Sequence, residues 1–414
     1  MVELGKDYRR ASLKTIQNKE REMYMPYDFT SFYDRRSEGS RKWESIDQCQ
    51  ECEENLIVPM TVADLDLHTA PEITNVLKKY VDKSILGYSK PTENYFQAVI
   101  DYMGKHYDYP LEEEWIVPTA GVVPALAASL RAFTEEKEGV IVFPPVYNPF
   151  YEVVENQNRE IMTSPLQLKN NRYEIDFDQL ENLARNEKAK LIFLCSPHNP
   201  SGRVWKKEEL LRISEIAESN NLLVMSDEIH ADMTLEGQKH FLYASISEKA
   251  AAHSLVFTSA SKSYNLAGLQ SSNVFISNSE LREKFEAANS VIGLKCPNVL
   301  GLKATAAAYQ KADKWFEELM VLLNNNVNLT IDMLSEADSR FKVMRPEASY
   351  LVWVNIEEFG LTNEEFVSKL EDQHIYVTDG DRYGKEGDGW IRLNVGMPTK
   401  ALLANLERFK KLTF

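Results

Sequence analysis

A lysine, an aspartate and an asparagine each follow an apolar run in this chain. Lys262 follows the run 254–258, Asp227 follows 222–225, and Asn199 follows 191–195. Burial lowers a lysine pKa, and a neutral amine can form a Schiff base with a carbonyl compound. A carboxylate stabilises a nearby cationic ring nitrogen, and an asparagine amide can donate to a phenolate oxygen. Enzymes that use pyridoxal phosphate (PLP) need such a lysine and such an acid.

Each residue also has a simpler interpretation when it is taken alone. A lysine after a strand is usually a solvated loop charge, and an aspartate there commonly caps a helix. Asn199 lies in Ser196–Gly202, where two prolines and a glycine predict a rigid turn. The order of the three motifs is therefore more informative than any one of them.

A fourth segment has the composition of a phosphate site. The small residues of 119–123 precede the helical stretch Pro124–Leu130. Small side chains let an anion approach the backbone, and free N–H groups at a helix start favour negative charge. A plain glycine turn before a helix is the alternative.

The elements that must position these residues alternate along the chain. Strands are predicted at 140–143, 191–195, 222–225, 254–258 and 273–276, with helical segments such as 207–220 between them. This alternation predicts a mainly parallel sheet covered on both faces, whose ligands lie at the carboxyl ends of the strands. After about Leu300, long helices precede strands within 349–354 and 390–394, which predicts a smaller α+β domain.

The motifs together resemble the fold-type I PLP enzymes of the class I/II aminotransferase family, and more closely its cystathionine β-lyase (C–S lyase) subgroup. The resemblance runs from about Tyr27 to the C-terminus. The matching motifs are 34–36, 40–43, 62–66, 87–88, 121–125, 145–150, 197–203, 226–230, 259–262, 265–270 and 391–394.

This resemblance implies the aspartate aminotransferase-like PLP-transferase fold. That fold has a large domain with a mainly parallel seven-stranded sheet and a smaller α+β domain. We expect residues 1–74 to form an N-terminal arm and part of the small domain, residues 75–300 the large PLP-binding domain, and residues 301–414 the C-terminal small domain.

The resemblance also implies roles for individual residues. Lys262 would hold the cofactor and act as general base, Asp227 would pair with the pyridinium nitrogen, and Tyr147 would stack on the ring. The remaining cofactor contacts would be Asn199, His230, Gly121, Val122, Ser259, Ser261 and, from the neighbouring subunit of a homodimer, Tyr88. Substrate contacts would be Arg392, Ala63 and Tyr88.

Three positions differ from the pattern of the wider class or of the lyase subgroup. Many aminotransferases have an arginine for the phosphate where this chain has Gln270, and the lyases usually have a tryptophan where it has Thr61. His230 replaces the tyrosine of the wider class, which favours the lyase subgroup. We expect a pocket near the substrate side chain that is wider or more polar than usual.

The function predicted first is β-elimination from S-substituted cysteines, which gives a thiol, pyruvate and ammonia. An aminotransferase would use the same residues, because both reactions begin with loss of the Cα proton. A regulatory protein that keeps PLP for structural reasons is the third hypothesis, and an intact set of Lys262, Asp227 and Arg392 argues against it as the sole role.

Composition limits the possible partners. The chain has 414 residues and a net charge of −16, which argues against nucleic-acid or anionic-membrane binding. We expect a cytoplasmic protein with a small amino-acid substrate and no metal. Its four cysteines argue against a disulfide framework. We interpret the Cys49–Cys52 spacing as coincidence, with a redox pair as the alternative.

Overall fold

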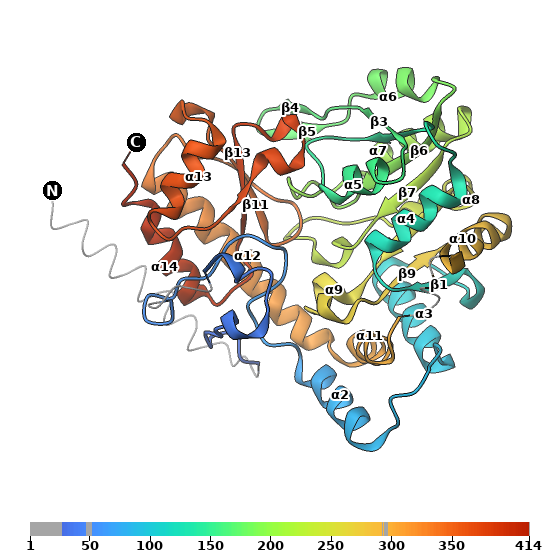
Figure 1. The fold of residues 1–414 in the computed structure, drawn as a ribbon, viewed down its shortest axis with the longest axis horizontal. Helices are drawn as coiled ribbons and strands as arrows, with labels where there is room; N and C mark the ends of the chain where they lie inside the picture. Colours follow the sequence, from blue (N-terminus) through green and yellow to red (C-terminus); the bar gives the residue numbers. More distant parts are fainter. Residues whose placement is uncertain (1–26, 47–51, 292, 294–296, 414) are drawn as a thin grey trace.

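The computed structural model describes residues 27–46, 52–291, 293 and 297–413, and its larger sheet has seven strands in the order β1-β9-β8-β7-β6-β2-β3 (Figure 1). The strands are β1 (Ile116–Thr119), β2 (Gly139–Val142), β3 (Glu160–Thr163), β6 (Ala189–Cys195), β7 (Leu223–Asp227), β8 (Ser254–Thr258) and β9 (Ser272–Phe275). Within this sheet β9 alone runs antiparallel to its neighbours. The predicted mainly parallel sheet is confirmed.

Both faces of this sheet are buried. In β6, Leu191 and Phe193 pack into one hydrophobic cluster, and the alternate residues Ile192 and Leu194 pack into another. Successive strand residues point to opposite faces, so a strand covered on both sides must be apolar throughout. The continuous apolar runs of the sequence therefore follow from the layered architecture.

Helices surround the two sheets. They are α2 (Pro71–Lys83), α3 (Glu93–Tyr107), α4 (Val122–Phe133), α5 (Pro149–Glu155), α6 (Phe177–Ala184), α7 (Lys207–Ser219), α8 (Glu248–Ala252), α9 (Ala260–Ser263), α10 (Ser279–Val291), α11 (Val299–Lys311), α12 (Asp313–Ala337), α13 (Asn363–Glu371) and α14 (Thr399–Phe409). Among the described residues, no helix combines the length and the apolar character needed to cross a bilayer.

The smaller sheet is antiparallel and lies in the C-terminal part of the chain (Figure 1). Its order is β10-β11-β13-β12, with β10 (Lys342–Met344), β11 (Leu351–Asn355), β12 (Thr378–Asp379) and β13 (Trp390–Asn394). A separate hairpin joins β4 (Gln167–Lys169) to β5 (Arg172–Glu174). A capping box of Thr362 and Glu365 fixes the start of α13 by satisfying free N–H groups.

The N-terminal segment, blue in Figure 1, lies beside the C-terminal part of the chain. The rings of Phe29 and Trp315 are 5.6 Å apart, and Met60 forms a parallel bridge with Val377 of the small domain. The described part of this segment therefore contacts the C-terminal part of the chain. The expected arm at residues 1–26 lies outside the described residues, and the domain limits stay a prediction.

Candidate active site

Three of the predicted site residues lie at one edge of the large sheet. Strands β6, β7 and β8 are parallel neighbours, with Cys195 opposite Asp227 and Asp227 opposite Phe257. Asn199 follows β6, Asp227 ends β7, and Lys262 lies in the short helix α9 after β8. Because parallel strands end at the same edge, the chain brings these groups together.

The Lys262 side chain is partly buried. It donates to the Ala63 carbonyl at 2.5 Å. The pKa of Lys262 is lowered to about 8, mainly by burial and also by the charge of Arg392, although the carboxylates of Asp64 and Asp227 act in the opposite direction. A substantial neutral fraction at physiological pH makes this amine a usable nucleophile and base.

Asp227 is a buried carboxyl group, 3% exposed. It accepts a hydrogen bond from the backbone N–H of Ile229 at 3.2 Å. Burial raises the pKa of Asp227 to about 7, although this hydrogen bond and the charge of Lys262 act in the opposite direction. A cationic group placed beside Asp227 would stabilise its ionised form, as the pyridinium interpretation requires.

Asn199 and Arg392 are in direct contact across the two sheets. The Arg392 guanidinium donates to Asn199 Oδ1 at 3.1 Å and to the Thr61 carbonyl at 2.9 Å. Since Oδ1 is already an acceptor, the Asn199 amide N–H groups are left to donate to a ligand. The Arg392 Nε is buried and has no hydrogen-bond partner among the described residues. This unused donor is consistent with a carboxylate ligand.

His230 is buried and Tyr147 is partly buried near the same groups. Burial lowers the pKa of His230 to about 3, with Lys262 and Arg392 adding to the effect, so the imidazole is neutral. Its Nδ1 has no partner among the described residues. Burial also raises the pKa of Tyr147, with the charge of Asp227 contributing, so the phenol stays protonated. Both groups can therefore donate a hydrogen bond.

The expected phosphate residues lie at two helix starts. Gly121, at φ +132°, immediately precedes α4, which begins at Val122. Ser259 immediately precedes α9, accepts from the Ser261 N–H at 3.1 Å and donates to the Ser271 carbonyl at 2.6 Å. Strand β9 connects the two regions, because it pairs with both β1 and β8.

One expected contact, Tyr88, is not assembled within the single chain. Tyr88 is fully exposed in the connection between α2 and α3, so its predicted role in a neighbouring subunit is untested. Gln270, the residue in place of the phosphate arginine, is exposed and has a left-handed backbone at φ +47°.

Cys52 is buried and disulfide-bonded. The interpretation of the Cys49–Cys52 spacing also depends on Cys49, which lies outside the described residues.

The structure adds contacts that sequence reasoning did not assign. The Tyr350 hydroxyl donates to the Ala63 carbonyl at 3.0 Å, and the Tyr383 ring lies 5.3 Å from the Arg392 guanidinium. The sequence predicts Tyr350 only as part of a strand within 349–354, and no motif around it indicates a role in a site.

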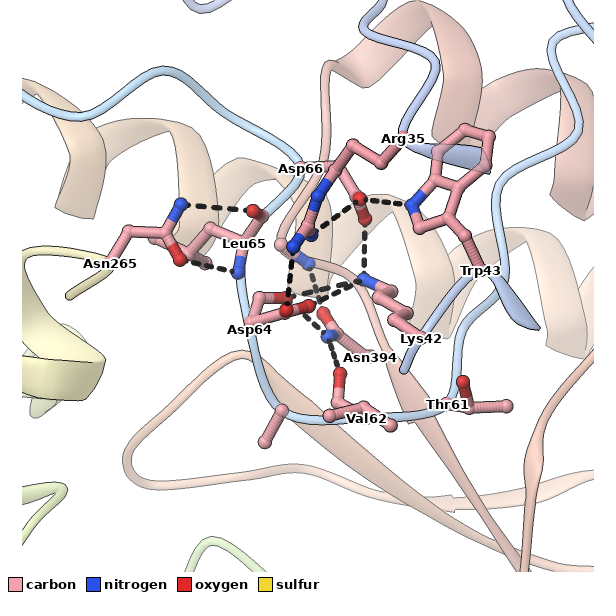
Figure 2. A network of polar contacts seen from close by, with 12 residues as sticks. Arg35, Lys42, Trp43, Thr61, Val62, Asp64, Leu65, Asp66, Asn265 and Asn394 are labelled. Carbon is pink, nitrogen blue, oxygen red and sulfur yellow. Dashed lines mark hydrogen bonds and ion pairs between the residues drawn. The ribbon is translucent and has the colours of Figure 1, made fainter. Parts of the chain in front are cut away.

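A partly buried ion-pair cluster also lies around Asp64 and Asp66 (Figure 2). Asp66 is 3% exposed and accepts from Lys42 Nζ at 2.5 Å and from Trp43 Nε1 at 2.7 Å. Arg35 pairs with Asp64 at 3.1 Å and reaches Asp66 at 3.4 Å. Two cations balance two carboxylates, which is the arrangement that a buried cluster requires. These residues belong to the motifs 34–36, 40–43 and 62–66, and the resemblance supplied no role for any of the five.

The fold and this strand-edge site define a class, and comparison with known proteins agrees. The model of the family "Aminotransferase class I and II" matches residues 57–409. The chain belongs to the class I and II aminotransferase family, which confirms the family prediction.

Three relatives show how much of the chain the similarity covers. Cystathionine beta-lyase PatB of Bacillus subtilis is 37% identical, covering 91% of this chain and 98% of that protein. Cystalysin from Treponema denticola, whose crystal structure contains a pyridoxal 5′-phosphate cofactor, has a TM-score of 0.91 at 35% identity, covering 94% and 98%. A PLP-bound C–S lyase from Staphylococcus hominis has a TM-score of 0.85 at 29% identity, covering 94% and 98%.

The residues of this chain fit pyridoxal phosphate. The cofactor aldehyde needs an amine, which Lys262 offers, and its ring nitrogen needs an acid, which Asp227 offers. The buried His230 Nδ1 and Arg392 Nε lack partners among the described residues, as expected of polar groups that serve a ligand.

Proposed function

We propose that this protein is a PLP-dependent carbon–sulfur β-lyase that cleaves S-substituted cysteines to a thiol, pyruvate and ammonia. The observation that carries the proposal is that Lys262, Asp227 and Arg392 converge at the carboxyl edge of the sheet in a chain similar to C–S lyases along nearly its whole length.

In this proposal the cofactor supplies an electron sink that acidifies the Cα–H bond of a bound amino acid. Lys262 holds the cofactor, Asp227 keeps its ring nitrogen protonated, and Tyr147 stacks on the ring. The remaining cofactor contacts are Asn199, His230, Gly121, Val122, Ser259, Ser261 and the partner subunit's Tyr88.

The chain itself binds the substrate and moves the proton. Arg392 takes the substrate carboxylate through its planar fork of donors, with Ala63 and Tyr88 as further contacts. The Lys262 amine then accepts the Cα proton, a role for which a pKa of about 8 suits it. Loss of the thiolate from Cβ and hydrolysis of the remaining fragment give the three products.

Thr61 affects specificity in this proposal. Its carbonyl already accepts from Arg392, so its side chain lies on a segment in direct contact with the proposed carboxylate site. A threonine fills less space than the tryptophan usual in the lyase subgroup. We expect S-alkyl cysteines of varied size to be cleaved, rather than cystathionine alone.

We further propose a homodimer located in the cytoplasm. Ile85, Leu86 and Tyr88 are 90%, 62% and 112% exposed in the connection between α2 and α3. Three large apolar or aromatic side chains in one exposed connection are typical of a surface that a partner covers. A second copy of this chain would cover it and place Tyr88 in the neighbouring site.

The test compares elimination with amino-group transfer. Purified protein with PLP is given cystathionine or S-methylcysteine without a keto acid, and pyruvate, ammonia and free thiol are measured. Transfer from common amino acids to 2-oxoglutarate or pyruvate is measured in parallel. We expect the three products in equal amounts and slower transfer. Faster transfer with no thiol release would replace the lyase by an aminotransferase.

A further inference from the structure

Four successive carbonyl groups of the segment 61–64 each accept a hydrogen bond from a side chain. The donors are Arg392 to Thr61 at 2.9 Å, Asn394 to Val62 at 2.6 Å, Lys262 to Ala63 at 2.5 Å and Asn394 again to Asp64 at 2.7 Å. The segment thus connects the amine of Lys262 with the guanidinium of Arg392.

Asn394 is fully engaged in this arrangement. It lies two residues after Arg392 in β13, so both side chains leave the same face of the strand. Its Nδ2 bonds the two carbonyl groups of the segment, and its Oδ1 accepts from the Gly396 N–H at 2.8 Å. The side chain is completely buried, and its removal would take one donor from each of the two carbonyl groups. Val62 would keep only the Asp64 N–H, at 2.9 Å, and Asp64 only Lys42 Nζ, at 3.2 Å.

Asn265 binds the adjoining residues 65–67 through side-chain hydrogen bonds. It lies three residues after Lys262 with a left-handed backbone at φ +56°, a conformation that asparagine and glycine adopt most readily. Its Oδ1 accepts from the Leu65 N–H at 3.1 Å. Its Nδ2 donates to the Leu65 and Leu67 carbonyls, both at 3.0 Å. The amide side chain thereby pairs with the Leu65 peptide in both directions, as a neighbouring strand would (Figure 2).

The ion-pair cluster described above fixes the same segment from outside. Asp66 is held by Lys42 and Trp43, and its own N–H donates to the Gly396 carbonyl at 2.9 Å. The segment is therefore restrained by side chains from the N-terminal motifs, from β13 and from the residues after α9.

We propose that Asn265 and Asn394 are positioning residues that hold the backbone of 61–67 so that the Ala63 carbonyl faces the Lys262 amine and the Thr61 carbonyl faces Arg392. The proposal rests on the proposed function in one respect, the attachment of PLP to Lys262. In it, the two asparagines act through the backbone and do not touch the substrate.

The expected effect on protonation has a definite sign. An accepting carbonyl favours a proton on the Lys262 nitrogen, and so does the nearby Asp64 carboxylate. Asp227 acts in the same direction, whereas Arg392 opposes it and His230 is neutral. Loosening the segment removes two of the groups that favour the proton. The pH midpoint of the lysine–cofactor linkage should therefore fall.

The test uses the holoenzyme and two variants with matched controls. Asn265→Gly keeps the left-handed backbone and removes the amide, and Asn221→Gly makes the same change at an exposed left-handed position, φ +55°. Asn394→Ala removes a buried amide that bonds two carbonyls. Asn405→Ala does the same within α14, where the amide bonds the Leu56 and Ala401 carbonyls.

The readouts are the pH titration of the cofactor absorbance and the dissociation constant of PLP. Asn265→Gly and Asn394→Ala should lower the titration midpoint by at least about half a pH unit and weaken PLP binding by roughly tenfold. The two controls should leave both quantities unchanged, even where thermal stability falls.

Two results have different meanings. Wild-type protein that binds no PLP would refute the proposed function itself. Wild-type protein that binds PLP, with variants that lose thermal stability but keep the wild-type midpoint and affinity, would overturn the positioning role. If Asn394→Ala fails to fold, Asn265→Gly decides the question, because its backbone geometry is preserved.

Discussion

At the scale of single residues, the site is built from groups whose burial disfavours their charged forms. Lys262 has its pKa lowered to about 8, and Asp227 has its pKa raised to about 7. Both changes have burial as the largest cause, and each group lies within the electrostatic influence of the other. A site of this kind is prepared for a ligand that supplies a carbonyl carbon and a cationic ring nitrogen.

This lysine predicts how cofactor capture depends on pH. Only the neutral amine attacks the aldehyde, and at pH 7 a pKa of about 8 leaves roughly one tenth of it neutral. The rate at which cofactor-free protein takes up PLP should therefore rise with pH and level off above about 8. Stopped-flow absorbance measures this rate, with Lys262→Arg as the control that forms no linkage. A rise that continues toward pH 10 would contradict the lowered pKa.

A second prediction concerns the fork of Arg392. Replacement by lysine keeps the charge but loses the paired donors, so binding of the substrate carboxylate should weaken by about 2 kcal/mol. We expect Arg392→Lys to raise KM by roughly thirtyfold, with a smaller change in kcat. Steady-state kinetics with S-methylcysteine measure the split, and an S-substituted cysteamine, which lacks the carboxylate, serves as control. Equal losses on both compounds would exclude a carboxylate role.

At the scale of elements, the loop that carries Asn199 docks directly on the small domain. The Gly202 carbonyl accepts from the N–H groups of Glu347 and Ala348, both at 2.9 Å. A Cβ at Gly202 would lie 2.5 Å from the Pro346 Cβ, and the backbone there is left-handed at φ +70°. This contact links a proposed cofactor ligand to the position of the small sheet.

The consequence is a matched pair of glycine variants. Gly202→Ala and Gly237→Ala both place a side chain on a left-handed backbone, which costs about 1–2 kcal/mol. Gly237 has open space around it, so the additional clash, about 1–3 kcal/mol, applies to Gly202 alone. Denaturant unfolding should show the larger loss for Gly202→Ala, together with weaker PLP binding. Equal losses in the two variants would show that the docking contact adjusts freely.

At the scale of the whole molecule, the proposed homodimer predicts that inactive subunits can complement each other. Tyr88→Phe weakens a neighbour's site and Lys262→Ala disables its own, so some mixed dimers contain one site with neither change. Mixing the two variants should restore part of the lyase activity, at most about one half in each hybrid dimer. Subunit exchange is verified first by native mass spectrometry. Exchange without recovered activity would rule out a site shared through Tyr88.

Much of this architecture could be predicted from the sequence. The predicted strand at 254–258 coincides with β8, because an apolar run between helical segments has few alternatives in a sheet buried on both faces. The predicted strand at 222–225 is extended to Asp227, since the polar end of β7 still pairs with β8. Strand β3 was not predicted, because Glu160–Thr163 lies near the edge of the sheet and lacks a continuous apolar pattern.

The residues of the site also differ in whether the sequence could predict them. Lys262, Asp227 and Asn199 were predictable because each ends or follows a recognisable strand. The roles of Asn265 and Asn394 were not, because their partners are backbone groups about 200 and 330 positions away. No local pattern encodes such pairings, so the sequence supplied no role for either asparagine.

The distance along the chain between Asn394 and the segment 61–64 has a consequence for the order in which the protein folds. The bond from Asn394 to Asp64 spans 330 residues, whereas Asp227 ends β7 and Lys262 closely follows the adjacent strand β8. Contacts of such long range form late, because ordering the intervening chain costs entropy before the contact is made. A newly made chain should thus form its cofactor site before it forms the contacts that position Arg392 for the substrate carboxylate. Pulse-labelled refolding would then capture a species that takes up PLP but does not yet discriminate amino acids from simple amines.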